Sequence, residues 1–107
     1  MSERKRKNMY PPARVSSQVH ERLKDRSERT GVKMYALALR AVQEVTLEAL
    51  LDPEWRPPAD YSKSLGINMA TRERLDALTE RTGLKKYVVI DRAVRAFLDS
   101  REENADG

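Results

Sequence analysis

Apolar and polar residues follow the same order twice along the chain. Each time, a short alternating segment precedes a stretch with helical spacing and then a second, more apolar helical stretch. The alternating segments are residues 13–15 and 64–67, in which successive side chains point to opposite faces of an extended backbone. The apolar residues are expected to face a core. The residues expected to face outward are Arg14, Ser64 and Gly66.

A capping residue follows each alternating segment. Ser16 and Asn68 can accept a hydrogen bond from the first free N–H groups of a helix, which predicts helices over roughly residues 17–29 and 69–81. A glycine follows each helix, since glycine tolerates the left-handed conformation that ends many helices. These two glycines are Gly31 and Gly83.

A second helix is expected to start near Lys33 and near Lys85. Residues 87–90 (YVVI), taken alone, are also typical of a buried strand. The aligned stretch in the first half, residues 35–42 (YALALRAV), consists mostly of strong helix formers. Because related copies should share a fold, we expect a helix in both.

The two halves are copies of one unit. A shift of 52 positions aligns residues 14–42 with residues 66–94 without a gap, and 12 of these 29 positions are identical. Average residue usage would give about two identities by chance. One strand and two helices cannot bury enough apolar surface alone. We therefore expect a mainly α fold in which two short strands, one from each copy, pair antiparallel over an interlocked four-helix core.

The copies are joined by a proline-rich linker. Its three prolines exclude a helix and favour an extended segment, which Trp55 and Tyr61 are expected to pin to the body. The predicted organisation is a basic arm (1–9), copy one (10–51), the linker (52–61), copy two (62–98) and an acidic tail (99–107), with both ends expected to be disordered.

Composition narrows the functional classes. The chain has 21 Lys and Arg against 17 Asp and Glu, a formal charge of +4 that is consistent with a nucleic-acid partner. It has no cysteine and a single histidine, His20, which we place on the exposed face of the first helix, so no metal site is expected. No catalytic set, cofactor loop, signal peptide or membrane span is recognisable. The sequence predicts a non-enzymatic, cofactor-free protein of the cytoplasm.

The copies resemble the ribbon-helix-helix (MetJ/Arc-like) family of DNA-binding proteins, normally homodimers of short chains. The resemblance rests on residues 67–98 (INMATRERLDALTERTGLKKYVVIDRAVRAFL) and, more loosely, on residues 15–42. The tandem layout is similar to TraY-type accessory proteins of plasmid relaxosomes. The resemblance implies sequence-specific binding of double-stranded DNA by a two-stranded ribbon in the major groove, in a prokaryotic transcriptional regulator or a conjugal-transfer accessory protein.

The resemblance also implies residue roles. The ribbon's outward side chains would read bases, with Arg14 able to bind guanine bidentately. The start of each second helix would hold phosphates; relatives often cap this helix with Ser or Thr, whereas this chain has lysine. The base-reading set is Tyr10, Pro12, Arg14, Ser62, Ser64 and Gly66. The phosphate-binding set is Lys33, Lys85 and Lys86, with Arg4, Lys5, Arg6 and Lys7 of the arm.

Plainer alternatives stand beside these roles. Arg14 and the lysines could be ordinary solvated charges, and the arm a solvated tail or a nuclear-localisation run. A rival function is an antitoxin or another protein-binding module that uses the tail. The linker also permits a domain-swapped dimer. Because the two strands carry different residues, we expect an asymmetric DNA site, with self-association on DNA and relaxosome proteins as further partners to test.

Overall fold

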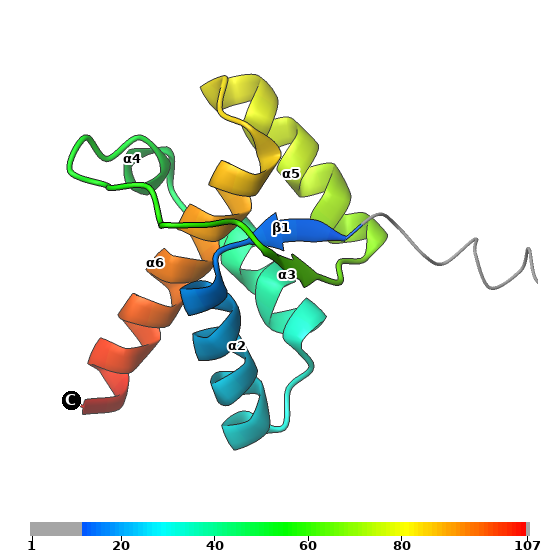
Figure 1. The fold of residues 1–107 in the computed structure, drawn as a ribbon, viewed down its shortest axis with the longest axis vertical. Helices are drawn as coiled ribbons and strands as arrows, with labels where there is room; N and C mark the ends of the chain where they lie inside the picture. Colours follow the sequence, from blue (N-terminus) through cyan, green and yellow to red (C-terminus); the bar gives the residue numbers. More distant parts are fainter. Residues whose placement is uncertain (1–11, 107) are drawn as a thin grey trace, which may run out of the picture.

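The computed structural model describes residues 12–106, and the side chains of residues 12–100. It is mainly helical, with a small two-stranded antiparallel sheet (Figure 1). The elements, in chain order, are β1 (Ala13–Val15), α2 (Ser17–Thr30), α3 (Met34–Glu44), α4 (Leu47–Leu50), β2 (Lys63–Leu65), α5 (Met69–Thr82) and α6 (Lys86–Asp106).

The two strands form one ribbon in which each repeat supplies a strand. β1 and β2 pair antiparallel, with Ala13 opposite Leu65 and Arg14 opposite Ser64. Val15 and Leu65 are buried, whereas Arg14 and Ser64 are exposed, as the alternation predicts.

The ribbon is shorter than expected, because β2 ends at Leu65 and leaves Gly66 and Ile67 outside it. Pro12 comes just before β1, and it would lie opposite Gly66 if the pairing continued. Proline has no N–H to donate to the ladder, which accounts for the early end.

The first helix of each copy is capped as the sequence predicts. The Ser16 side chain accepts from the Val19 N–H at 3.2 Å, and that of Asn68 accepts from the Thr71 N–H at 2.9 Å. Both helices end at a glycine with φ of 76°, in the left-handed region. These glycines are Gly31 and Gly83, and each helix is one residue longer than expected.

The second helices are present in both copies. Residues 87–90 lie in α6, so the helical interpretation is correct and the strand alternative is wrong. α6 continues to Asp106, through most of the segment expected to be disordered, where Arg101, Glu102, Glu103 and Ala105 are good helix formers. The short helix α4, which begins after Thr46, was not expected.

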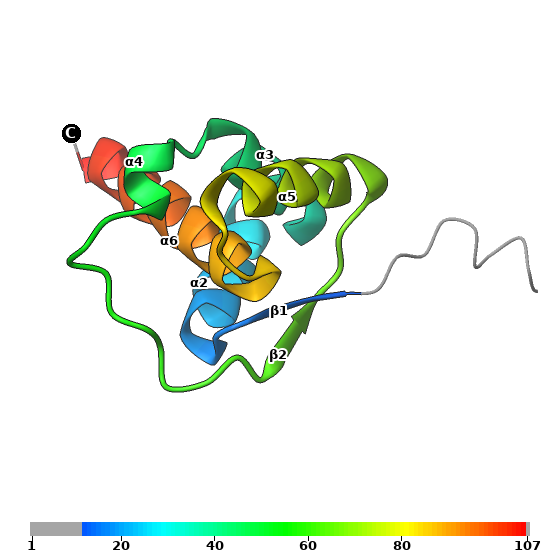
Figure 2. The ribbon, with the colours of Figure 1, turned by 90° about the horizontal axis from the view of Figure 1, so that it is seen from above.

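The core is centred on α6, which packs against α2, α3, α4, α5 and β1 (Figure 2). The two copies contribute unequally to it. α2 buries Val19 and Leu23, whereas α5 also buries Leu78, whose counterpart in α2 is Arg26. The fully buried apolar side chains of α6 are Val89, Ile90, Ala93, Val94 and Leu98.

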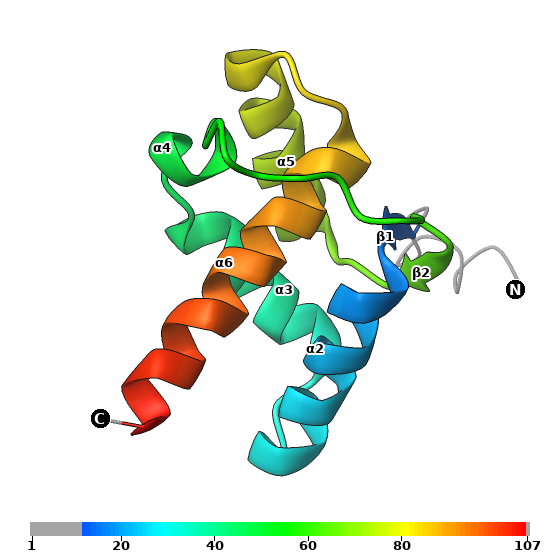
Figure 3. The ribbon, with the colours of Figure 1, turned by 60° about the vertical axis from the view of Figure 1, so that its left-hand side comes forward.

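The segment between α4 and β2 is irregular and crosses α6 on its way to the ribbon (Figure 3). The guanidinium of Arg92 lies 3.8 Å from the ring centroid of Trp55. The rings of Tyr61 and Tyr87 meet edge to face, with centroids 4.6 Å apart. Both contacts join the linker to α6, so the prediction that these two aromatic residues pin it is confirmed.

Among the described residues, no helix combines the length and the apolar character needed to cross a bilayer.

Candidate nucleic-acid interface

The outer face of the ribbon carries Arg14 and Ser64 directly opposite each other. The Nη1 of Arg14 donates to the carbonyl oxygen of Ser62 at 3.2 Å, so the guanidinium lies beside β2 while remaining exposed. Pro12, Ser62 and Gly66 are exposed as well, just beyond the ends of the strands. The described members of the predicted base-reading set therefore lie together around one small exposed ribbon.

A carboxylate that the sequence reasoning missed organises the entry to β2. Asp60 accepts from the Ser62 hydroxyl at 2.9 Å and from the Ser62 N–H at 3.3 Å. It also accepts from the backbone N–H of Ser17 at 3.3 Å, which ties the linker to the start of α2. These hydrogen bonds, led by that of the Ser62 side chain, lower the pKa of Asp60. An Asp two residues before a Ser is a common turn signal and could have identified it.

The second helices start in the same way in both copies. Lys33 precedes α3 in an extended conformation, and its side chain makes no capping hydrogen bond. Its carbonyl accepts from the N–H groups of the third and fourth residues that follow, and the carbonyl of Lys85 does the same before α6. Because lysine offers no acceptor, neither side chain can cap the positive end of its helix.

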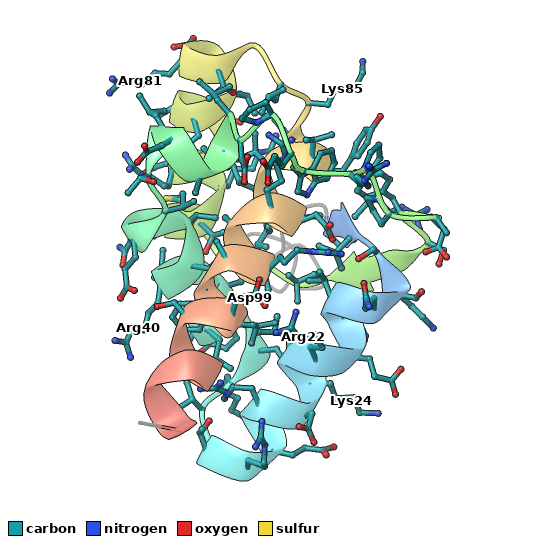
Figure 4. The ribbon with its side chains drawn as sticks, turned by 90° about the vertical axis from the view of Figure 1, so that its left-hand side faces the viewer. Arg22, Lys24, Arg40, Arg81, Lys85 and Asp99 are labelled. Carbon is teal, nitrogen blue, oxygen red and sulfur yellow. The ribbon has the colours of Figure 1, made fainter. Side chains whose placement is uncertain are left out.

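Lys33 and Lys85 are both exposed. The starts of α3 and α6 lie on either side of the ribbon in Figures 1 and 3. In Figure 4, Lys85 projects from the ribbon side, whereas Arg40 and Arg81 project from the opposite edge. Lys86 is exposed too, but its Nζ lies 3.0 Å from a carboxylate oxygen of Asp76, so part of its charge is already compensated.

A second missed residue is Arg72, on the first turns of α5. It lines a pocket with Arg14 and Lys86 at one edge of the ribbon. No signal in the linear sequence places these three cations together, because they come from three separate elements.

Some predicted residues are not part of this arrangement. Tyr10, Arg4, Lys5, Arg6 and Lys7 lie outside the described residues. His20 is half-buried on α2 rather than fully exposed. Within the part of the chain that the structure describes, no three His, Asp or Glu side chains converge on a position for a metal ion.

Comparisons of the chain with protein-family models, with curated proteins and with solved structures found no match.

Proposed function

We propose that this chain is a tandem ribbon-helix-helix protein that binds double-stranded DNA sequence-specifically, with the β1–β2 ribbon in the major groove. The observation that carries the proposal is the antiparallel pairing of strands from the two repeats, with an apolar inner face and an exposed polar outer face. The major groove of B-DNA is wide enough to admit a two-stranded ribbon.

Arg14 is the main base reader in this proposal. Its guanidinium is exposed and can rotate from the Ser62 carbonyl to the O6 and N7 of guanine. The position equivalent to Arg14 in the second repeat is Gly66, and the equivalent of Pro12 is Ser64. The two halves of the ribbon therefore offer different groups to the bases, which favours an asymmetric DNA site.

The starts of α3 and α6 are the phosphate-binding positions in this proposal. An uncapped helix start attracts anions through its free N–H groups and its dipole. Lys33 and Lys85 add a positive charge at each start, on the two sides of the ribbon. The cellular role would be that of a transcriptional regulator or of a relaxosome accessory factor at a conjugal transfer origin.

Selection of bound sites from random double-stranded DNA, with the mass of the protein measured in solution, tests the proposal. The expected result is one enriched asymmetric motif, bound by a protein that is monomeric when free. A perfect palindrome bound by a dimer would indicate swapped pairing between chains. The absence of any enriched motif at low salt would refute sequence-specific binding.

A further inference from the structure

A pocket of about 220 Å³ opens at one edge of the ribbon, between β1, α5 and α6. Its wall and floor are largely apolar, with Ile67, Leu75 and Tyr87 among the lining residues. Leu75 is fully buried below the opening, whereas the other two are half-buried. The pocket therefore offers apolar contact area that is exposed to solvent.

Three cations line the same pocket: Arg14 from β1, Arg72 from α5 and Lys86 from the start of α6. One carboxylate lies next to two of them. Asp76 is 3.0 Å from the Nζ of Lys86 and 3.9 Å from the Nε of Arg72. The cluster keeps a surplus of two positive charges, and the hydrogen bond that the Arg14 guanidinium donates within the described residues goes to a neutral carbonyl.

This combination occurs on one side of the ribbon only. A shift of 52 positions relates Arg14 to Gly66, Arg72 to His20 and Lys86 to Met34. All three cations are thus absent from the equivalent positions beside α2 and α3. Meanwhile Leu75 and Tyr87 have identical counterparts in Leu23 and Tyr35. Apolar residues therefore occupy the equivalent positions on both sides of the ribbon, whereas the three cations occur only on the side of α5 and the start of α6.

We propose that this pocket binds a small carboxylate with an aromatic or branched apolar body. The carboxylate would lie against Arg72 and Arg14, since arginine pairs with carboxylates through two parallel hydrogen bonds. The apolar body would contact Ile67 and Tyr87. The volume of about 220 Å³ suits a small, metabolite-sized acid. A phosphate of the DNA backbone would satisfy the cations but would leave the apolar floor unused.

The position of the pocket gives the ligand a regulatory effect, and this part rests on the proposed function. A bound carboxylate would engage Arg14, the proposed base reader, and would reduce the net positive charge beside the proposed phosphate-binding start of α6. Ligand binding and DNA binding would then compete. Ligand binding itself does not require that the protein bind DNA.

The two isoleucines of the chain provide a direct test by methyl NMR of the full chain. Ile67 lines the pocket, whereas Ile90 is fully buried in the core. With benzoate as the probe, we expect a saturable shift of the Ile67 δ1 methyl and no shift of the Ile90 methyl. Benzamide, which has the same shape without the charge, should bind at least about tenfold more weakly.

Two variants complete the test. Arg72→Gln should weaken benzoate binding at least about tenfold, while Arg81→Gln, on the same helix outside the pocket, should leave it unchanged. An unshifted Ile90 methyl in each variant shows that the core is intact. The proposal is overturned if benzoate produces no saturable shift, if benzamide or inorganic phosphate binds equally well, or if Arg72→Gln binds like Arg81→Gln. If benzoate binds without any effect on DNA binding, only the proposed competition between ligand and DNA is overturned.

Discussion

The carboxylate of Asp91 accepts a hydrogen bond from the backbone N–H of Ser16 at 2.8 Å, and both residues are buried. Ser16 joins β1 to α2, and Asp91 lies in α6, 75 residues along the chain. The position equivalent to Asp91 in the first repeat is Leu39, whose side chain cannot accept a hydrogen bond. This contact therefore has no equivalent between the other pair of elements, and it ties the end of β1 to α6.

Replacement of Asp91 by alanine is expected to lower the free energy of unfolding by about 1.5–3 kcal/mol, because the Ser16 N–H would stay buried without an acceptor. Asp91→Asn keeps an acceptor oxygen and should cost less. Urea unfolding followed by circular dichroism measures both. Asp99→Ala is the control, since it removes an exposed partner of Arg22 and should cost at most about 1 kcal/mol. Equal losses for Asp91→Ala and Asp99→Ala would contradict this role.

Substitution of the glycines that end α2 and α5 should lower the free energy of unfolding because of backbone conformation alone. Gly31 and Gly83 have φ of 76°, yet an added Cβ would meet nothing within 4 Å. Gly31→Ala and Gly83→Ala should each cost about 1–2 kcal/mol, from the left-handed conformation. Gly66 is equally uncrowded and does not have a positive φ, so Gly66→Ala should be close to neutral. Thermal unfolding distinguishes the three, and a cost at Gly66 equal to the others would contradict the explanation.

Asp60 should make the free energy of unfolding depend on pH under acidic conditions. Its pKa is lower in the folded chain than in the unfolded chain, because the hydrogen bonds from Ser62 and Ser17 favour the charged form. Its contribution is therefore complete above the unfolded pKa of about 3.9 and is lost as the pH falls through the folded value. The stability difference between the natural chain and Asp60→Asn should shrink between pH 5 and pH 3, measured by urea unfolding. A constant difference would show that Asp60 does not titrate as inferred.

Arg14→Ala should relax sequence preference if Arg14 reads a base. We expect a loss of about 1–3 kcal/mol on the selected site and a much smaller loss on random DNA. Fluorescence anisotropy with both duplexes measures the ratio. Arg40→Ala removes the same charge from the opposite edge of the molecule and should leave the ratio unchanged. Equal losses on both duplexes for Arg14→Ala would assign Arg14 to the DNA backbone instead.

Lys85→Ala should weaken binding evenly across sequences, because a phosphate contact carries no base information. The natural chain should show a log–log salt slope near −5 if about six phosphates are neutralised, and the variant's slope should be smaller in magnitude by about one. Arg81→Ala, on the far edge, provides the charge-matched control. Unchanged slopes in Lys85→Ala would remove this helix start from the interface.

Local elements were predictable because their signals are local. Ser16 and Asn68 each cap a helix within three residues, and Gly31 and Gly83 end the helices by their own backbone freedom. The continuation of α6 to Asp106 and the short helix α4 were missed. α4 is held by Thr46 as a cap and by burial of Leu50, whose partner helix α6 lies far along the chain.

The candidate site was predictable only in part. Alternation along each strand identified Arg14 and Ser64 as outward-facing, but it does not contain the register that sets them opposite each other. Arg72 was missed because its role depends on Arg14 and Lys86, which other elements bring close. For Asp60 the local turn with Ser62 was predictable, but its contact with Ser17 was not. Side chains from separate elements converge only after the chain folds.

The amino-acid sequence by itself determined the duplication, the caps and the inward and outward faces of each element, since these depend on chemistry within a few residues. Only the tertiary structure decided the register of the β1–β2 pair, which residues of α6 Trp55 and Tyr61 contact, and that three cations line one pocket. These features depend on contacts between segments far apart in the sequence, such as Tyr61 with Tyr87 and Arg14 with Lys86, where the packing of α6, and not local propensity, sets the geometry.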